Sequence, residues 1–318
     1  MKYPLDSTVL CSVLVTCLAA AGCSDANTDA TGSDTPVRER PLVITTFYPT
    51  EYLVERLAGE WVNVRCDVPG DADALFWKPS DEQVLEYQKA DLIVLNGAGM
   101  ETWVEHMSLP LSRVVDTSRA FEDRFVDFEA ATHSHGGGED HTHSGTDPHI
   151  WLDPLNVEQQ ALALHSALKL RLPDHEADLQ ANMDALSADL KSVHESYLAL
   201  GKGVQGVWMY ASHPAYNYLA SRYGWKIVNL DLDPEQELAD AQLNQIRDLM
   251  QDKAGQFILW ESEPLASTVD RLRSEVGLES VTVTPCELMS AEERASGSDF
   301  LGVLRANGEV LGRALSQE

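Results

Sequence analysis

The sequence predicts an α/β protein with two similar halves on either side of one long helix. Short apolar runs alternate with helical patterns along most of the chain, which is typical of parallel sheets covered by helices. This alternation occurs twice, before and after residues 174–200, where the apolar residues follow the period of one uninterrupted helix. A long helix at this place in an α/β chain is expected to act as a rigid strut between two lobes.

The first half contains strands and helices in alternation. The apolar run at residues 41–47 predicts a strand, and residues 51–60 predict a helix. Residues 61–68 alternate in polarity as a strand does, and residues 79–90 are helical in pattern. The apolar run at 91–99 predicts a buried strand that ends in glycine.

The segment from Asp174 to Leu200 carries the strongest helical signal. Its apolar positions are separated by 4, 3, 4, 3, 4 and 3 residues, which places them all on one face of a helix about 40 Å long. These positions are Leu179, Met183, Leu186, Leu190, Val193, Tyr197 and Leu200.

The second half repeats the rhythm of the first without repeating its sequence. Strands are predicted at residues 206–211, 225–230, 256–261 and 280–284, and helices at 215–223, 238–253 and 267–277. The order again favours a parallel sheet flanked by helices.

The N-terminus has the features of an export and anchoring segment. The apolar run within residues 1–22 is too short to span a bilayer as a permanent helix but suits a signal peptide. Small residues lead into Cys23 as in a lipobox, so we expect Cys23 to be lipidated; a plain cleaved signal peptide is the alternative. Residues 23–40 lack an apolar pattern and are predicted to be a flexible tether. The expected location is therefore periplasmic or cell-surface, at a membrane.

Composition excludes a nucleic-acid partner. The chain has 318 residues, of which 44% are hydrophobic and 23% charged, as in globular proteins. Lys+Arg number 23 and Asp+Glu 51, for a formal net charge of -28. An acidic surface of this kind repels phosphate backbones and attracts cations.

Histidines are concentrated before the long helix. Four of them, His133, His135, His141 and His143, lie in the Gly/Ser/Asp-rich segment 133–145, which cannot pack a core. Neutral imidazoles on such a mobile loop capture zinc, copper or nickel loosely, and the alternative is a solvated loop with incidental metal affinity.

Two further histidines stand in defined surroundings. His149 follows Asp147-Pro148, and His213 comes at the end of a predicted strand, just before Pro214. The carboxyl ends of parallel strands are where ligands bind in α/β sheets. Two such histidines together with carboxylates would make a zinc or manganese site.

Several segments resemble one family. DPHIWLDPLN, SHPAYNYLASRYG, LNGAGMETWVEHM and TTFYPTEYLVERLAG followed by PSDEQV are similar to the zinc/manganese-binding substrate-binding proteins of bacterial ABC importers, the cluster A-I type of metal-binding lipoprotein, over roughly residues 41–315. The resemblance implies two α/β lobes, each a mostly four-stranded parallel sheet, joined by one rigid helix, with metal held between them. It also implies a monomer that delivers metal to a membrane permease powered by a separate ATPase.

The resemblance also indicates where the metal ligands would lie. His149 and His213 match two ligand positions of the family, and a His at the third site favours zinc over manganese. Asp73 stands where the first ligand His is expected, and counting from Glu261, which matches a family glutamate, puts Thr284 where the late Asp is usual. Asp73 would then coordinate directly, with Glu261 or a water completing the shell. Alternatively the cleft site is weakened, and the histidines of segment 133–145 contribute ligands.

The cysteines and the domain limits complete the expectations. Cys286 could be a ligand but is expected to be a buried inert thiol, and whether it pairs with Cys66 is left open. The predicted domains are a signal peptide at 1–22, a tether at 23–40, a lobe at 41–173, a linking helix at 174–200 and a second lobe at 201–318.

The sequence argues against enzymatic activity. It has no GxxxxGK[ST] motif, so any ATP hydrolysis would belong to another subunit, and no HExxH motif of the kind found in zinc hydrolases. We therefore predict a binding protein that catalyses nothing. A metal-dependent surface adhesin or a periplasmic zinc buffer on the same scaffold is the alternative.

Overall fold

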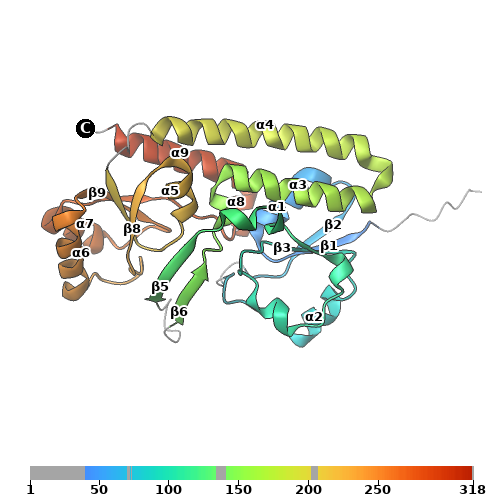
Figure 1. Cartoon of the computed structure of the whole chain (residues 1–318), viewed down its shortest axis with the longest axis horizontal. Coiled ribbons are helices and arrows are strands. Elements are labelled where there is room, and N and C mark those ends of the chain that lie inside the picture. The colour runs from blue at the N-terminus through green and yellow to red at the C-terminus, as the bar shows by residue number, and fades with distance from the viewer. Residues whose placement is uncertain (1–39, 70–71, 73, 134–140, 202–206, 317–318) are drawn as a thin grey trace, which may run out of the picture. The chain divides into compact units, whose positions relative to one another are not determined.

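The computed structural model describes residues 40–316 apart from 70–71, 73, 134–140 and 202–206 (Figure 1). Residues 40–318 form one compact unit. The predicted signal peptide, Cys23, most of the tether, Asp73 and His135 therefore lie outside the described residues, and the expectations attached to them stay predictions.

The first sheet is parallel and four-stranded. Its strands are β1 (Leu42–Thr45), β2 (Asn63–Cys66), β3 (Leu92–Leu95) and β4 (Val114–Asp116), in the order β2-β1-β3-β4. Helices α1 (Tyr48–Ala58) and α2 (Asp81–Tyr87) connect the first three strands. β3 is buried along its whole length, as expected for a central strand of a parallel sheet.

The second sheet has the same topology as the first. Its strands are β7 (Trp208–Ala211), β8 (Lys226–Asn229), β9 (Gly255–Trp260) and β10 (Glu279–Thr282), in the order β10-β9-β7-β8. In both sheets the first strand lies between the second and the third. The flanking helices are α5 (Asn217–Tyr223), α6 (Asp240–Asp252), α7 (Ala266–Val276), α8 (Ala291–Ala295) and α9 (Phe300–Leu315).

On one side of the sheets lie α9 and the two long helices α3 and α4 (Figure 1). α3 (Pro154–Arg171) begins with the Asp153 side chain capping the Leu155 N–H and Pro154 in the first turn. α4 (Glu176–Gly201) has 26 residues and corresponds to the long helix predicted at 174–200; it packs against α3 and α9. Six of its seven predicted apolar positions are buried, and Leu200 is half-buried.

The histidine-rich segment differs from the expected loop. β5 (Asp127–His133) and β6 (His141–Thr146) pair as an antiparallel hairpin, with His133 opposite His141. His133, His141 and His143 therefore lie in strands, because backbone pairing does not require the apolar alternation that the segment lacks. Short 3-10 turns occur at Thr102–His106, Leu111–Arg113, Arg119–Arg124, Ile150–Leu152 and Pro173–His175.

One hydrophobic core is shared by both sheets. It joins Val43 and Val94 of the first sheet to Met209 and Leu259 of the second, with Leu186 of α4 in the same cluster. A smaller cluster covers the other face of each sheet.

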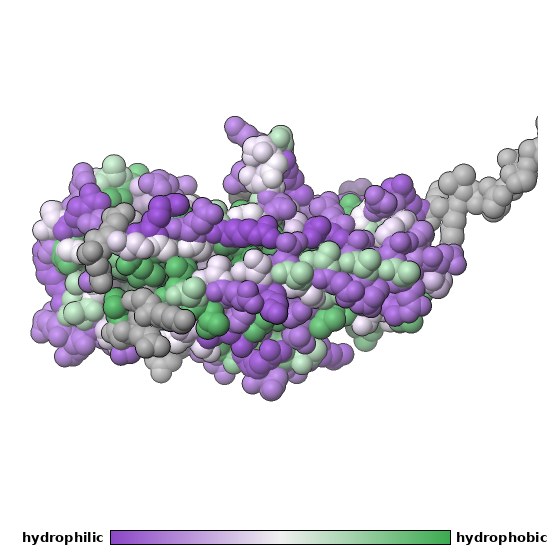
Figure 2. Space-filling view, turned by 90° about the horizontal axis from the view of Figure 1, so that it is seen from above, coloured by the Kyte–Doolittle hydropathy of each residue, from purple (hydrophilic) through white to green (hydrophobic). Residues whose placement is uncertain are grey.

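Seen from the side of α4, the surface is mostly hydrophilic (Figure 2). In the described part of the chain no helix is long and apolar enough to cross a bilayer.

Candidate metal centre

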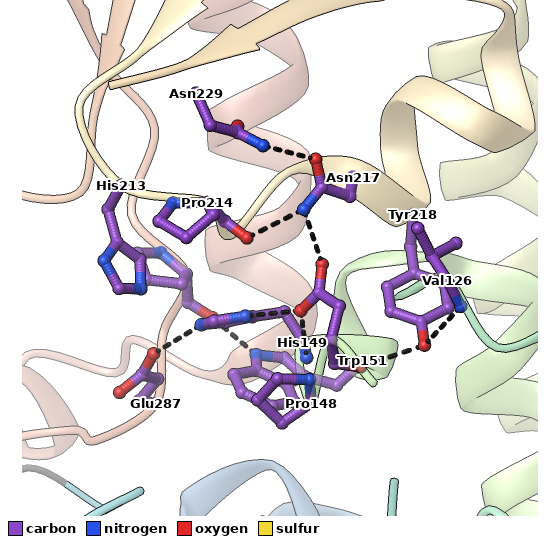
Figure 3. Close-up of polar contacts among 12 residues, drawn as sticks. Val126, Pro148, His149, Trp151, His213, Pro214, Asn217, Tyr218, Asn229 and Glu287 are labelled. Atoms are coloured by element: carbon purple, nitrogen blue, oxygen red, sulfur yellow. Dashed lines mark hydrogen bonds and ion pairs between the residues drawn. The ribbon is translucent and has the colours of Figure 1, made fainter. Parts of the chain in front are cut away.

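His149 is held by the buried carboxylate of Asp147, two residues earlier in the loop between β6 and α3. Asp147 Oδ1 accepts the backbone N–H of His149 at 2.9 Å and contacts its Nδ1 at 2.7 Å. This pairing fixes the orientation of the ring and directs Nε2 to Oε1 of Glu287, 3.2 Å away (Figure 3). A carboxylate on the far nitrogen is the usual support of a metal-binding histidine.

The charge state of His149 follows from these two carboxylates. Burial of the ring lowers the pKa of His149, but Asp147 and Glu287 outweigh burial and raise the pKa to about 10. Without metal the ring is therefore an imidazolium between two acceptors. A metal that binds here replaces the proton on Nε2, because only an unprotonated nitrogen can coordinate.

His213 lies just beyond the carboxyl end of β7 in the second sheet, and the carboxyl ends of parallel strands are where ligands usually bind in α/β sheets. It comes two residues after β7, and Glu261 directly follows the neighbouring strand β9. In this sheet the strand order reverses between β7 and β9, which makes this pair of strand ends the topological switch point. His213 Nδ1 lies 3.9 Å from Glu261 Oε2.

The structure brings the two predicted histidines together. The ring centroids of His149 and His213 are 5.3 Å apart, and the rings meet edge to face at 78°. Each ring has a glutamate beside it, Glu287 for His149 and Glu261 for His213. Among the described residues no three histidine, cysteine or carboxylate side chains are already grouped closely enough to hold an ion.

Glu287 is the residue that the sequence analysis missed. Counting along the chain placed the late ligand at Thr284, but the Thr284 hydroxyl accepts the Cys286 N–H at 3.3 Å and its carbonyl accepts Asn307 Nδ2 at 2.8 Å. The backbone then turns at Cys286, which has a positive φ of 60°. This turn presents Glu287 to His149. The sequence offered one signal for this residue, since Glu287 is a carboxylate within a few residues of Thr284, where the late ligand was expected.

Cys66 and Cys286, the two cysteines in the described part of the chain, are free thiols. The open question of their pairing is thus answered for this structure. Burial raises the pKa of Cys286 to about 12 and that of Cys66 to about 11. Thiolate is the form that binds metal, so the raised pKa values agree with the expectation that Cys286 is inert.

At the equivalent place in the first sheet, the ends of β1 and β3, the Glu101 side chain is bonded to the residues that follow the two strands. The Glu101 carboxylate accepts the Thr46 hydroxyl at 2.5 Å and the backbone N–H groups of Asn96 and Gly97 at 2.7 and 3.1 Å. Burial raises the pKa of Glu101 to about 7, although these three hydrogen bonds oppose the rise. Glu101 therefore has a structural role here.

Hydrogen bonds join the His149 loop to the second sheet's side of the centre. Trp151 Nε1 donates to the Pro285 carbonyl at 2.8 Å, and Arg222 Nε donates to Asp153 at 2.7 Å. Tyr218 Oη donates to the Asp147 carbonyl at 2.9 Å. The two halves of the centre are thus held by direct contacts as well as by the shared core.

Comparison with known sequences identifies the family. The sequence model of the ZnuA family, described as "Zinc-uptake complex component A periplasmic", matches residues 43–314. The chain belongs to this family. The resemblance found in the sequence is thereby confirmed, and the description as a zinc-uptake component agrees with a binding protein and not an enzyme.

Two curated relatives are about a quarter identical to this chain over the aligned residues. The zinc-binding lipoprotein AdcA of Streptococcus pneumoniae strain R6 is 27% identical over 283 residues, which are 87% of this chain and 56% of AdcA. The chain thus spans about half the length of the AdcA relatives. The high-affinity zinc uptake system protein ZnuA of Bacillus subtilis strain 168 is 26% identical over 305 residues, covering 94% of this chain and 95% of that protein.

Solved structures confirm the fold. The metal-dependent lipoprotein YcdH of Bacillus subtilis superposes with a TM-score of 0.74 at 24% identity, covering 86% of this chain and 98% of YcdH. The Zn(II)-bound ZnuA-like domain of Streptococcus pneumoniae AdcA gives a TM-score of 0.72 at 23% identity, with 87% and 100% covered. The predicted α/β class with two parallel four-stranded sheets and one long helix is therefore correct.

Proposed function

We propose that this chain binds one zinc ion between the strand ends of its second sheet and the His149 loop, and supplies it to an ABC importer. The observation that carries this proposal is the facing pair of His149 and His213, 5.3 Å apart between ring centroids, in a ZnuA-family chain. The permease and its separate ATPase would be other subunits, and the ion is cargo that must be released again.

The proposed ligands are the two imidazoles together with carboxylates. Glu287 and Glu261 each lie beside one of the histidines, and Asp73 stays a candidate as predicted from the sequence. Tetrahedral zinc accepts nitrogen and carboxylate oxygen at bond lengths of about 2.0–2.2 Å. Two nitrogen ligands favour zinc, because manganese prefers oxygen ligands. Manganese is the alternative cargo.

Several relatives' names support parts of the proposal. The Streptococcus pneumoniae AdcA is named a zinc-binding lipoprotein, and the Bacillus subtilis ZnuA is named a high-affinity zinc uptake system protein. By analogy the chain would work outside the cytoplasm, held to a membrane by lipid on Cys23. The laminin-binding adhesin Lmb of Streptococcus agalactiae and the laminin-binding protein Lbp of Streptococcus pyogenes share the fold, at TM-scores of 0.68 and 0.66. Adhesion is accordingly the second candidate.

Native mass spectrometry of the chelator-stripped chain, titrated with zinc and with manganese, tests the proposal. The unaltered protein is compared with the His149→Ala/His213→Ala double variant, with a deletion of residues 133–145 and with His106→Ala, which removes an exposed imidazole elsewhere. One tightly bound zinc that survives the deletion and the His106 change but is absent from the double variant is the expected result. Loose, multiple zinc ions that disappear with the deletion would overturn the proposal in favour of buffering or adhesion.

A further inference from the structure

We infer that Asn217 is a positioning residue that sets the distance between the two histidines, and through that distance the preference for zinc over manganese. The inference rests on the proposed function, since it deepens the role of the same centre. Asn217 opens helix α5, on the second sheet's side, and is half-buried between the turns that carry His149 and His213 (Figure 3).

The side-chain amide of Asn217 has all its polar atoms engaged. Nδ2 donates to Asp147 Oδ2 at 2.9 Å and to the Pro214 carbonyl at 3.1 Å. Oδ1 accepts the Asn229 side chain at 2.9 Å. Both partners of Nδ2 are acceptors only, so the amide nitrogen must face them and the orientation of the group is determined.

One of these bonds reaches His149. Asp147 is fully buried, and its two oxygens are divided between neighbours: Oδ1 serves the backbone and ring of His149, and Oδ2 takes the amide of Asn217. A rotation of the carboxylate would break both sets of bonds. Asn217 therefore fixes the plane of Asp147, and Asp147 fixes the ring of His149.

The other bond reaches His213. Pro214 directly follows His213, and the Ala215 N–H donates to the His213 carbonyl at 2.9 Å, which makes a tight turn. Asn217 Nδ2 holds this turn by the Pro214 carbonyl. A single nitrogen thus ties together the two turns that bear the facing imidazoles.

Tyr218 provides a matched comparison. It also joins α5 to the His149 loop, but its hydroxyl bonds the Asp147 carbonyl and accepts the Val126 N–H at 3.2 Å. These two hydrogen bonds reach neither the Asp147 carboxylate nor the His213 turn. Loss of Tyr218 Oη removes a link between the halves without releasing either imidazole.

The expected consequence concerns selectivity. Removing a group that supports a metal ligand from behind usually costs about 10–100-fold in metal affinity. Zinc in a four-coordinate site depends on the spacing of its nitrogen ligands, whereas manganese takes more oxygen ligands and relies less on them. Asn217→Ala is therefore expected to lower zinc affinity by about tenfold or more and to lower manganese affinity by less.

The test measures Zn²⁺ and Mn²⁺ dissociation constants by chelator competition in the chain lacking residues 1–22. The absorption spectrum of bound Co²⁺ is recorded as well, because it depends on coordination geometry. Asn217→Ala is compared with Tyr218→Phe and Asn229→Ala, which leave both bonds from Asn217 Nδ2 in place. Asn217→Leu, which keeps the side-chain volume, replaces the Ala variant if that variant fails to fold. Crystal structures of the metal-free wild type and Asn217 variant give the ring separation directly.

We expect the Asn217 variant alone to show a lower zinc-to-manganese affinity ratio and an altered Co²⁺ spectrum. Its ring separation should also differ from the wild-type value. An unchanged ratio, or an equal change in Tyr218→Phe, would overturn the inference while leaving zinc binding intact. If the wild type binds no zinc through His149 and His213, the proposed function fails. The inference about Asn217 is then decided by the metal-free crystal structures. A ring separation that differs between the wild type and the Asn217 variant supports it, and an equal separation overturns it.

Discussion

Asp147 and Glu287 flank the same imidazole but differ in how firmly they are held. Asp147 is fully buried and bonded at both oxygens, whereas the Glu287 side chain is 25% exposed and contacts His149 Nε2 at 3.2 Å. Zinc bound as proposed would therefore displace the proton between Glu287 and His149 and leave the Asp147 pairing intact. Glu287 would then change from accepting a hydrogen bond to coordinating the ion.

Glu287→Gln tests this division. The amide keeps the size of the side chain but removes the negative charge and one acceptor oxygen, so zinc affinity should fall by about tenfold or more. Isothermal titration of the chelator-stripped protein with zinc measures the change, and Glu292→Gln, at an exposed position nearby in the chain, is the control. An affinity equal to that of the wild type would show that Glu287 does not ligate.

Glu101 makes stability depend on pH. In the folded chain its pKa is about 7, above the ordinary value of 4.5, so the folded state holds this proton more tightly than the unfolded state does. The stabilisation is fully present below pH 4.5 and is lost as the pH rises to about 7, by roughly 3 kcal/mol at most.

Urea unfolding of Glu101→Gln between pH 4.5 and 7 checks the pH dependence. Gln cannot titrate, so the fall in unfolding free energy assigned to Glu101 should disappear from the variant profile. Glu105→Gln, at an exposed position, should retain the wild-type profile. Identical profiles for wild type and Glu101→Gln would rule out Glu101 as the source.

The sequence identified the histidines but not all of their partners. His149 and His213 could be predicted because each stands in a short, specific motif. Glu287 could not, because the turn at Cys286, with its positive φ, determines which side chain of that loop faces His149. Asn217 was equally hidden, since its importance lies in bonds to two turns that are far apart in the chain.

The two helices α4 and α3 differ in how well the sequence predicted them: α4 was predicted and α3 was not. α4 shows a clean apolar stripe, so its limits were predicted to within two residues. α3 buries polar residues as well, among them Gln160, which donates to Asn96 Oδ1 at 3.1 Å and Thr117 Oγ1 at 2.8 Å. Such buried polar bonds interrupt the apolar period from which helices are predicted.

The stripe of α4 predicts how substitutions in this helix affect stability. Leu186→Ala removes a fully buried side chain from the shared core and should lower the free energy of unfolding by about 2–5 kcal/mol. Leu198→Ala is the same change at a position 52% exposed and should cost about 0.5 kcal/mol or less. Denaturant unfolding of both variants measures the difference. Similar losses in the two would mean that α4 does not pack as described.

At the scale of the whole molecule, the two sheets share a topology but differ in the side chains that lie at their topological switch points. In the first sheet the Glu101 carboxylate is hydrogen-bonded at this place to residues that follow the strands. In the second sheet His213 and Glu261 lie there, and the His149 ring of the loop from the first half meets that of His213. The centre therefore requires both halves in their present arrangement.

The shared core predicts that residues 40–318 unfold in a single cooperative transition. Chains of this length often unfold in steps, but here apolar residues of both sheets and α4 belong to one cluster, and the centre adds bonds across it. Zinc bound between the halves as proposed would stabilise both at once. At a free zinc concentration 100 times the dissociation constant the gain is about 2.7 kcal/mol, or about 5 °C in melting temperature.

Calorimetry of the metal-free and zinc-loaded protein measures this effect. One transition with equal calorimetric and van't Hoff enthalpies is expected in both states, moved upward as a whole by zinc. The His149→Ala/His213→Ala variant should keep the single transition and lose the shift. Two transitions, of which zinc raises only one, would mean that the halves fold independently and that the ion contacts one of them. Since His149 and His213 come from opposite halves, that result would also contradict their joint ligation of the ion.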